Sequence, residues 1–584
     1  MSVPIAVKPP RTSERPPWVR NVVLGLIAAV VLWFLAAAVM LWQARQSIES
    51  GIDRLEEARD LLSPGDLVQG EGRPVLEAAE RDFARARDLA GSPILAPFGF
   101  VPLLGAQVRS IESQTAAAAE VVGVGLDAMA QADAVFATTP QAGPERVAMI
   151  QEVGGIATQA EDRLSGVDLG SDFFLVGPIG DARQEFSERL TDIRQSLADS
   201  RLAADGFAQF LQGPSRYLLL AANNAEMRAG SGMWLSAGVL TAENGMTTVG
   251  ELVPTGDLVL PAGAVATPPE LAELWGFMAP TRDLRNLAVT PRFEVTAPLA
   301  VDMWGAATGD VVDGVMMVDP LVLRALLAAE GGVDVPGVGL LDADNVLPYV
   351  FLEQYSASGD LDADQQARRD QLGSVARTTL SALDTRPWES AALADELGPA
   401  AAGRHVLAWS SDPTEQRGWE AAGVAGAVGP DALLVSLMNT SGTKLDQFLS
   451  VEGEIEHDGG RVTVELTIRN DAPVGAPAYV IGPHPRAGLA EGVYRGILAF
   501  TVPGASGGVR LDGAGPLVVD GSDGPTRVIG VEVQLGRGEA VTITLEFDPP
   551  ADELVVEPSA RVPPISWRVG DLEWTDNQSE RVEW

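Results

Sequence analysis

The spacing of apolar residues changes twice along this chain of 584 residues, and each change limits what the segment can fold into. Up to about residue 212, apolar residues recur at the three- and four-residue spacing of helices that bury one face. Over residues 213–440, short apolar runs alternate with helical segments, as in an α/β domain. Over residues 441–552, polar and apolar residues alternate between glycine turns, which is typical of an all-β sandwich. We therefore predict a multidomain protein, because the chain is also too long for one core.

An uncharged apolar run near the N-terminus predicts a transmembrane helix over Asn21 to Gln43. About 20 apolar residues are enough to cross the hydrocarbon core of a membrane. Residues 1–20 form a basic tail and the segment after the run is acidic, so the positive-inside rule places the tail in the cytoplasm. A cleavable signal peptide is the alternative, but the apolar run continues to Trp42, beyond the small residues at 36–38. We expect a single-pass protein of the cell membrane, with the bulk of the chain extracytoplasmic.

The predicted order of domains follows from these patterns. After the anchor we expect a helical stalk or bundle over 44–212, then the α/β domain over 213–440 and the sandwich over 441–552. Residues 553–584 are predicted to be a polar C-terminal tail with room for one more strand.

Composition excludes several classes of function. The formal net charge is −39, which opposes binding to nucleic acid or to anionic lipid unless arginines cluster locally. The chain has no cysteine, which excludes thiolate metal sites and a cysteine nucleophile. It has three histidines, which disfavours a histidine-rich metal cluster.

One stretch, YLLLAANNAEMRAGSGM from Tyr217, combines a buried-looking strand with a dense polar end. Ligands of open α/β sheets bind at the carboxyl ends of strands. Four side chains at this end are therefore candidates for ligand binding: Asn223, Asn224, Glu226 and Arg228. The alternative is a structural role, in which the asparagines cap the strand and Arg228 pairs with an acid.

Several ordered motifs resemble a bacterial family called domain of unknown function 4012. They are YLLLAANNAEMRAGSGMW, TRDLRNLAVTPRFEVTAPLAVDMW, VDGVMMVDPLVLRALLAAEGGVDV, LDADNVLPYV and NTSGTKLDQFL. The resemblance extends from SPILAPFGFVPLLG to the C-terminal sandwich. It implies an anchored protein of the cell envelope and no particular reaction.

A more distant similarity links the VDGVMMVDP segment and the residues after it to the LytR-CpsA-Psr family. That resemblance implies a LytR-CpsA-Psr-like α/β domain that transfers glycopolymer from polyprenyl pyrophosphate, with arginines on the pyrophosphate and a divalent metal held by carboxylates. Carried over, it assigns Arg228, Asp313 and either Arg368 or Arg369 to the site. The family has an aspartate after its first-strand arginine, where this sequence has Ala229.

Three functions stay open on these grounds. The protein could bind or handle envelope glycopolymer or its polyprenyl-phosphate carrier, it could be an active glycopolymer phosphotransferase, or it could be a non-catalytic scaffolding protein. Convergence of Arg228, Arg368 and Arg369 on one pocket would favour the first two.

Overall fold

The computed structural model describes most of the chain. The described residues are 72–97, 102–136, 142–173, 175, 177–356, 361–484, 487–513 and 515–584, with part of 32–54, and side chains are not described at 102–104 and 361–370. Within this part of the chain, no helix is long and apolar enough to cross a membrane. The prediction of a transmembrane helix, and with it of a single-pass membrane protein, is corrected accordingly. Much of the predicted segment 21–43, including all of 21–31, lies outside the described residues.

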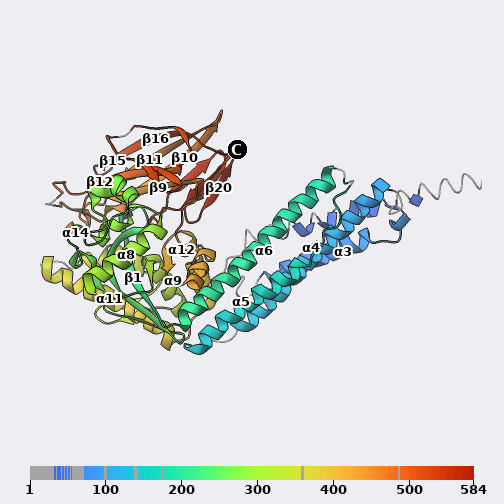
Figure 1. Cartoon of the computed structure of the whole chain (residues 1–584), viewed down its shortest axis with the longest axis horizontal. Coiled ribbons are helices and arrows are strands. Elements are labelled where there is room, and N and C mark those ends of the chain that lie inside the picture. The colour runs from blue at the N-terminus through green and yellow to red at the C-terminus, as the bar shows by residue number, and fades with distance from the viewer. Residues whose placement is uncertain are drawn as a thin grey trace, which may run out of the picture. The chain divides into compact units, whose positions relative to one another are not determined.

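The chain divides into two compact units, one comprising residues 1–62, 71–129 and 160–195 and the other comprising residues 63–70, 130–159 and 196–584. Long helices dominate the first 212 residues (Figure 1). They are α3 (Arg73–Ala90), α4 (Pro102–Phe136), α5 (Pro144–Ser165) and α6 (Gly177–Gln212). In the first unit, Phe83 of α3 packs with Ala118 and Val122 of α4 in a small apolar core.

A mixed sheet forms the centre of the second unit, in the order β3-β2-β1-β5-β8, with β4 also paired to β2. Its strands are β1 (Ser215–Met227), β2 (Gly232–Glu243), β3 (Met246–Val249), β4 (Val253–Pro254), β5 (Gly314–Val318) and β8 (Val406–Ser410). Only β1 and β5 run parallel, in the register that places Tyr217 opposite Gly314. The β2–β3 hairpin turns at Asn244 and Gly245, which both have positive φ, as the Asn-Gly dipeptide predicts.

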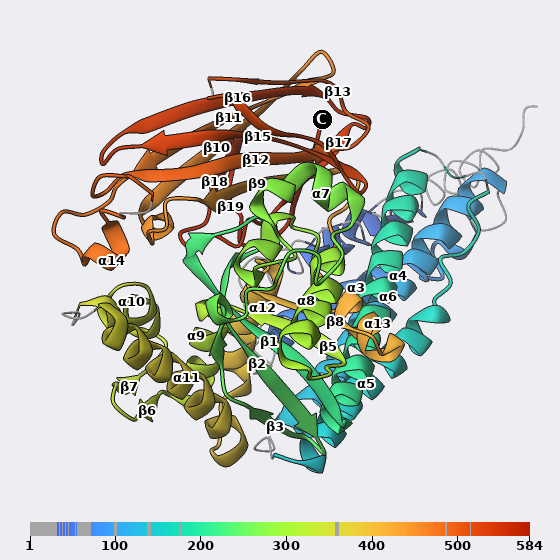
Figure 2. The ribbon, with the colours of Figure 1, turned by 60° about the vertical axis from the view of Figure 1, so that its left-hand side comes forward.

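Helices and short strands surround this sheet (Figure 2). The helices are α7 (Pro269–Trp275), α8 (Phe293–Thr308), α9 (Pro320–Glu330), α10 (Val346–Phe351), α11 (Leu361–Thr385), α12 (Ser390–Ala402) and α13 (Pro413–Ala421). Strands β6 (Val333–Val335) and β7 (Gly339–Leu341) form a separate hairpin. Helix α9 starts where Asp319 accepts a hydrogen bond from the Leu321 amide, and it ends at Gly331 with φ 72°. Both signals act within a few residues of the helix ends.

The C-terminal part is a sandwich of two six-stranded sheets, ordered β13-β16-β11-β10-β18-β19 and β14-β15-β12-β9-β17-β20. Its strands are β9 (Ala432–Asn439), β10 (Leu449–Asp458), β11 (Arg461–Asn470), β12 (Tyr494–Pro503), β13 (Gly507–Asp512), β14 (Leu517–Asp523), β15 (Thr526–Leu535), β16 (Ala540–Asp548), β17 (Glu553–Glu557), β18 (Ser566–Val569), β19 (Leu572–Thr575) and β20 (Glu580–Glu583), with the short helix α14 (Ala478–Ile481) between β11 and β12.

Two segments join the sandwich from outside the range 441–552. Strand β9 pairs with β12, and β17 pairs in parallel with β9. Strand β18 pairs in parallel with β10. The residues after 552 thus complete both sheets, where the sequence suggested a tail. The sequence does not reveal parallel pairing between strands about 100 residues apart, because no tight turn connects the two strands.

The α/β sheet and the sandwich share an apolar core. Leu218 and Leu220 of β1 belong to the same buried cluster as Met438 of β9 and Ile497 of β12. The sandwich and the α/β sheet therefore contribute to one buried apolar cluster, which also includes residues of α7 and α8.

Candidate functional site at the end of strand β1

The polar end of β1 folds back sharply. The pairing of β1 with β2 is irregular between Asn223 and Met227, and the Arg228 amide donates to the Ser231 carbonyl at 2.8 Å. Gly232 allows this approach, because a Cβ there would lie 2.4 Å from the carbonyl carbon of Asn223. The segment predicted to face a ligand is thus a tight turn against its own strand.

Arg228 is buried, with an exposed fraction of 5%. Its Nη1 donates to the carbonyls of Asn439 at 2.7 Å and Met227 at 3.1 Å, and its Nε donates to the Arg285 carbonyl at 2.9 Å. Its Nη2 donates to Asn286 Oδ1 at 3.1 Å. Burial lowers the pKa of the guanidinium below its ordinary value, although Glu226 and Asp446 oppose that effect. All three nitrogens are therefore engaged by protein acceptors.

Glu226 forms an ion pair with Lys444, whose side chain is 2% exposed. The Lys444 Nζ also lies 5.3 Å from the ring centroid of Tyr355 and 5.7 Å from that of Tyr479. These two rings stack on each other with centroids 5.1 Å apart. Burial by itself lowers the pKa of Lys444, but the Glu226 carboxylate and the two tyrosines outweigh burial and raise it above the ordinary value. Lys444 is therefore a buried, permanently charged partner of Glu226.

Asp446 lies beside this pair and is fully buried. Its Oδ2 accepts from the Met227 amide at 3.2 Å and from Asn439 Nδ2 at 2.6 Å, and its Oδ1 lies 3.8 Å from Arg561 Nη1. Burial raises the pKa of Asp446 to about 6, against the opposing effect of Arg561. The carboxylate thereby joins β1 to the sandwich strand β9.

The two asparagines are also held within the protein. Asn223 Oδ1 accepts from the Ala225 amide at 2.9 Å. Asn224 Nδ2 donates to Asp319 Oδ2 at 2.7 Å and to the Ala560 carbonyl at 2.8 Å. Asp319 Oδ2 also lies 2.5 Å from His405 Nδ1. The carboxyl ends of β1 and β5 are thus covered by the loop that follows β17.

The structure separates Asp313 from this group. Its Oδ2 accepts from the Arg216 amide at 3.0 Å, at the start of β1, whereas Arg228 follows the end of β1. A strand rises about 3.3 Å per residue, so the two side chains lie on the order of 30 Å apart. Arg368 and Arg369 belong to α11, but their side chains lie outside the described residues. The convergence expected from the resemblance is therefore absent for Asp313.

The donor set does not suit the divalent metal that the resemblance implies. Among the described residues, no group of three histidines, aspartates or glutamates is placed to hold an ion. Asp319 illustrates why, since Oδ1 accepts from the Leu321 amide and Oδ2 is taken by Asn224 and His405.

Sequence reasoning missed the residues that complete this cluster, namely Lys444, Asp446, Arg561, Asp319 and His405. One signal was available. Lys444 is one of only two lysines in the chain and stands in the motif NTSGTKLDQFL, which was singled out for its resemblance alone. A rare lysine in a chain whose other cations are almost all arginines indicates a specific structural role for that side chain.

Comparison with known proteins gives one family. The model described as "Protein of unknown function (DUF4012)" matches residues 212–355, which run from the last residue of α6 to the turn after α10. No curated protein and no solved structure matches the chain significantly. The similarity to the LytR-CpsA-Psr family stays a prediction. Residues 212–355 therefore match the DUF4012 family, as the motifs within that range predicted.

Proposed function

We propose that this chain is a non-catalytic scaffolding protein. In this proposal, the end of β1 is a structural junction that fixes the α/β sheet to the sandwich, at the place where other α/β proteins bind a ligand. Three side chains at this strand end, those of Arg228, Glu226 and Asn224, each form a hydrogen bond or ion pair with a residue from the second half of the chain.

The single observation that carries the proposal is the hydrogen bonding of Arg228. A guanidinium that binds pyrophosphate must direct its N–H groups at phosphate oxygens. In this chain, Nε, Nη1 and Nη2 all donate to protein oxygens, and the side chain is 5% exposed. Removing those bonds would leave buried acceptors unpaired, each of which costs about 1–3 kcal/mol.

The alternative functions place different demands on this site. Handling of a polyprenyl-phosphate carrier, and glycopolymer transfer from one, both need Arg228 to be accessible to phosphate. They also need an apolar groove for the lipid beside it. The junction at the end of β1 supplies buried polar partners at that place, which supports the scaffolding proposal over the two alternatives.

The proposal is tested on the full chain with Arg228→Ala, Arg228→Lys and the control Arg216→Ala. Arg216 is exposed and lies at the other end of β1. We expect Arg228→Ala to lower the free energy of unfolding by about 2–4 kcal/mol and Arg216→Ala to change it by less than about 0.5 kcal/mol. Titration calorimetry with inorganic pyrophosphate and with a polyprenyl pyrophosphate, with and without Mg²⁺, should show no saturable binding to the wild type.

One result would overturn the scaffolding role of Arg228. It is saturable binding of either pyrophosphate by the wild type that Arg228→Lys abolishes while the thermal unfolding midpoint stays unchanged. Arg228 would then be a ligand-binding residue.

A further inference from the structure

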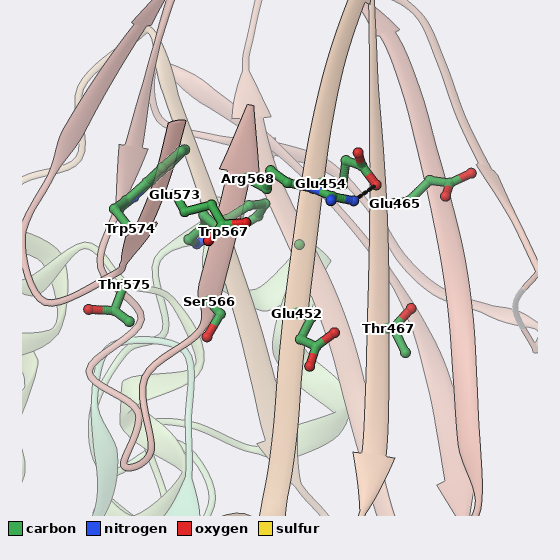
Figure 3. Close-up of a pocket in the computed structure, with 11 residues that line it drawn as sticks. Glu452, Glu454, Glu465, Thr467, Ser566, Trp567, Arg568, Glu573, Trp574 and Thr575 are labelled. Atoms are coloured by element: carbon green, nitrogen blue, oxygen red, sulfur yellow. Dashed lines mark hydrogen bonds and ion pairs between the residues drawn. The ribbon is translucent and has the colours of Figure 1, made fainter. Parts of the chain in front are cut away.

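The outward face of one sandwich sheet carries a hollow of about 660 Å³ (Figure 3). Its lining comes from the four neighbouring strands β11, β10, β18 and β19. The charged residues that line it are Glu452, Glu454, Glu465, Arg568 and Glu573, and hydroxyl groups are supplied by Thr467, Ser566 and Thr575. This hollow is separate from the junction at the end of β1, since no residue of that junction lines it.

The alternation of β10 explains why carboxylates gather here. Val451, Gly453 and Ile455 are buried on the core side, so Glu452 and Glu454 project outward. On the core side, the ring of Trp567 fills the space beside Gly453, where a Cβ would lie 2.4 Å from the ring. Trp567 in turn stacks on Trp574 with ring centroids 6.3 Å apart. Trp567 and Trp574 therefore pack on the opposite side of the sheet from the outward carboxylates.

The charge of this hollow is unbalanced. Arg568 Nη2 lies 2.8 Å from Glu454 Oε2, so its charge is already matched. The hydrogen bond that Arg568 donates to Glu454 raises the pKa of Arg568, and the charges of Glu573 and Glu452 add to that effect. Among the described residues, no arginine or lysine forms an ion pair with Glu452, Glu465 or Glu573. The surface consequently favours a cationic partner and disfavours a second copy of this chain, which carries −39 itself.

The hollow opens beside a strand edge. β19 is the last strand in the order of its sheet, and Glu573 and Thr575 of β19 line the hollow. In an antiparallel pair, every second residue directs its backbone N–H and C=O away from the partner strand. An extended peptide can pair with such an edge through its main chain while its side chains provide specificity.

We propose that this face binds an extended segment of a partner protein that contains lysine or arginine at alternate positions. The segment pairs with β19 and directs its cationic side chains towards Glu573 and into the hollow that Glu452 also lines. The proposal rests on the scaffolding role, since it names the kind of partner a scaffold would hold, but it concerns a surface outside the junction. Cross-strand pairs of opposite charge stabilise such an addition.

Binding is tested by fluorescence anisotropy on the full chain, with a short labelled peptide of alternating lysine and valine. Two further peptides serve as probes, one with glutamate at each lysine position and one with proline at each valine position, which keeps the charge but cannot pair as a strand. The protein variants are Glu452→Gln/Glu573→Gln and the matched control Glu456→Gln. Glu456 projects outward from the same strand, is exposed, and does not line the hollow.

We expect the lysine–valine peptide to bind the wild type, and the double variant to weaken binding by roughly tenfold. Glu456→Gln should leave the affinity within about twofold, and the glutamate and proline peptides should not bind. Equal binding of the proline peptide would overturn strand pairing with β19. Unchanged affinity in the double variant, or no binding by the lysine–valine peptide, would overturn the docking face itself.

The two proposals fail separately. Loss of the docking face with an intact junction, as measured by Arg228→Ala, leaves the scaffolding proposal standing without this partner. A ligand-binding Arg228 would remove the scaffolding role while the peptide affinity stayed as measured.

Discussion

Arg228 Nη1 donates a hydrogen bond of 2.7 Å to the carbonyl of Asn439, which lies 211 residues later in the chain. Arg228 follows the first strand of the α/β sheet, and Asn439 ends β9 of the sandwich. The side chain of Asn439 also donates from Nδ2 to Asp446. Asn439 therefore accepts a hydrogen bond from Arg228 and orients the carboxylate of Asp446. These hydrogen bonds link the end of the first α/β strand to the sandwich through buried polar groups.

The buried ion pair of Glu226 and Lys444 should contribute strongly to stability. Lys444→Met leaves the Glu226 carboxylate buried without its cation, so we expect the free energy of unfolding to fall by about 3–5 kcal/mol in denaturant titrations. Arg581→Met is the matched control, because Arg581 pairs with Glu553 at the surface and the loss should be below about 1 kcal/mol. The double variant Lys444→Met/Glu226→Leu should recover part of the loss. A loss in Lys444→Met no larger than in the control would contradict a structural role for the pair.

Asp446 should make stability depend on pH. Its pKa is raised to about 6 in the folded protein, so Asp446 binds a proton more readily in the folded protein than in the unfolded chain. The stabilisation is complete below the ordinary aspartate pKa near 4 and is lost as pH rises through about 6. Relative to the wild type, Asp446→Asn should therefore gain roughly 2–3 kcal/mol of unfolding free energy between pH 4 and pH 7. Parallel pH profiles for the two proteins would show that Asp446 does not titrate in this range.

Glu330 at the end of α9 offers a second test of buried charge. It is buried, and within the described residues neither carboxylate oxygen has a hydrogen-bond partner. Burial raises the pKa of Glu330 to about 8, against the opposing effect of Arg386. The folded protein therefore loses stability as pH rises from about 4.5 towards 8. Glu330→Met should raise the thermal unfolding midpoint, with a larger gain at pH 8 than at pH 5. A gain that does not vary with pH would mean that packing alone accounts for it.

Helices α6 and α13 approach each other at two glycines. A Cβ at Gly206 would lie 2.6 Å from the Cα of Gly418, so neither position has room for a side chain. Gly206→Ala should destabilise the protein by about 1–3 kcal/mol through overpacking. Gly155→Ala in α5 is the control, because a Cβ there meets nothing within 4 Å, and it should stabilise by up to about 1 kcal/mol. Equal effects on the unfolding midpoint would contradict the close approach.

Local patterns predicted much of the secondary structure. The apolar run before Asn223 gives β1, Asn244 and Gly245 give the β2–β3 turn, and Pro320 and Gly331 bound α9. Each of these features depends on residues close in sequence, where propensity and turn chemistry act directly. The apolar run at 21–43 shows the limit of such reasoning, since it predicted a membrane span that the described part of the chain does not contain.

The candidate site was predictable only in part. The sequence singled out Asn223, Asn224, Glu226 and Arg228, and all four lie in or directly after one strand end and are engaged there. Asp313 was grouped with them by resemblance, yet it lies directly before β5, beside the first residues of β1. The parallel register of β1 and β5 decides that separation.

The sequence by itself determined many of the helices and strands before residue 553 and which strand end carries the polar residues. Those features follow from periodicity and from turn residues that act over a few positions. Only the tertiary structure decided what these polar groups bind, because Asn439, Lys444 and Ala560 reach β1 from segments more than 200 residues away. Such partners are chosen by the packing of the sandwich against the sheet, which buries Arg228 and leaves its N–H groups no acceptors except those of the protein.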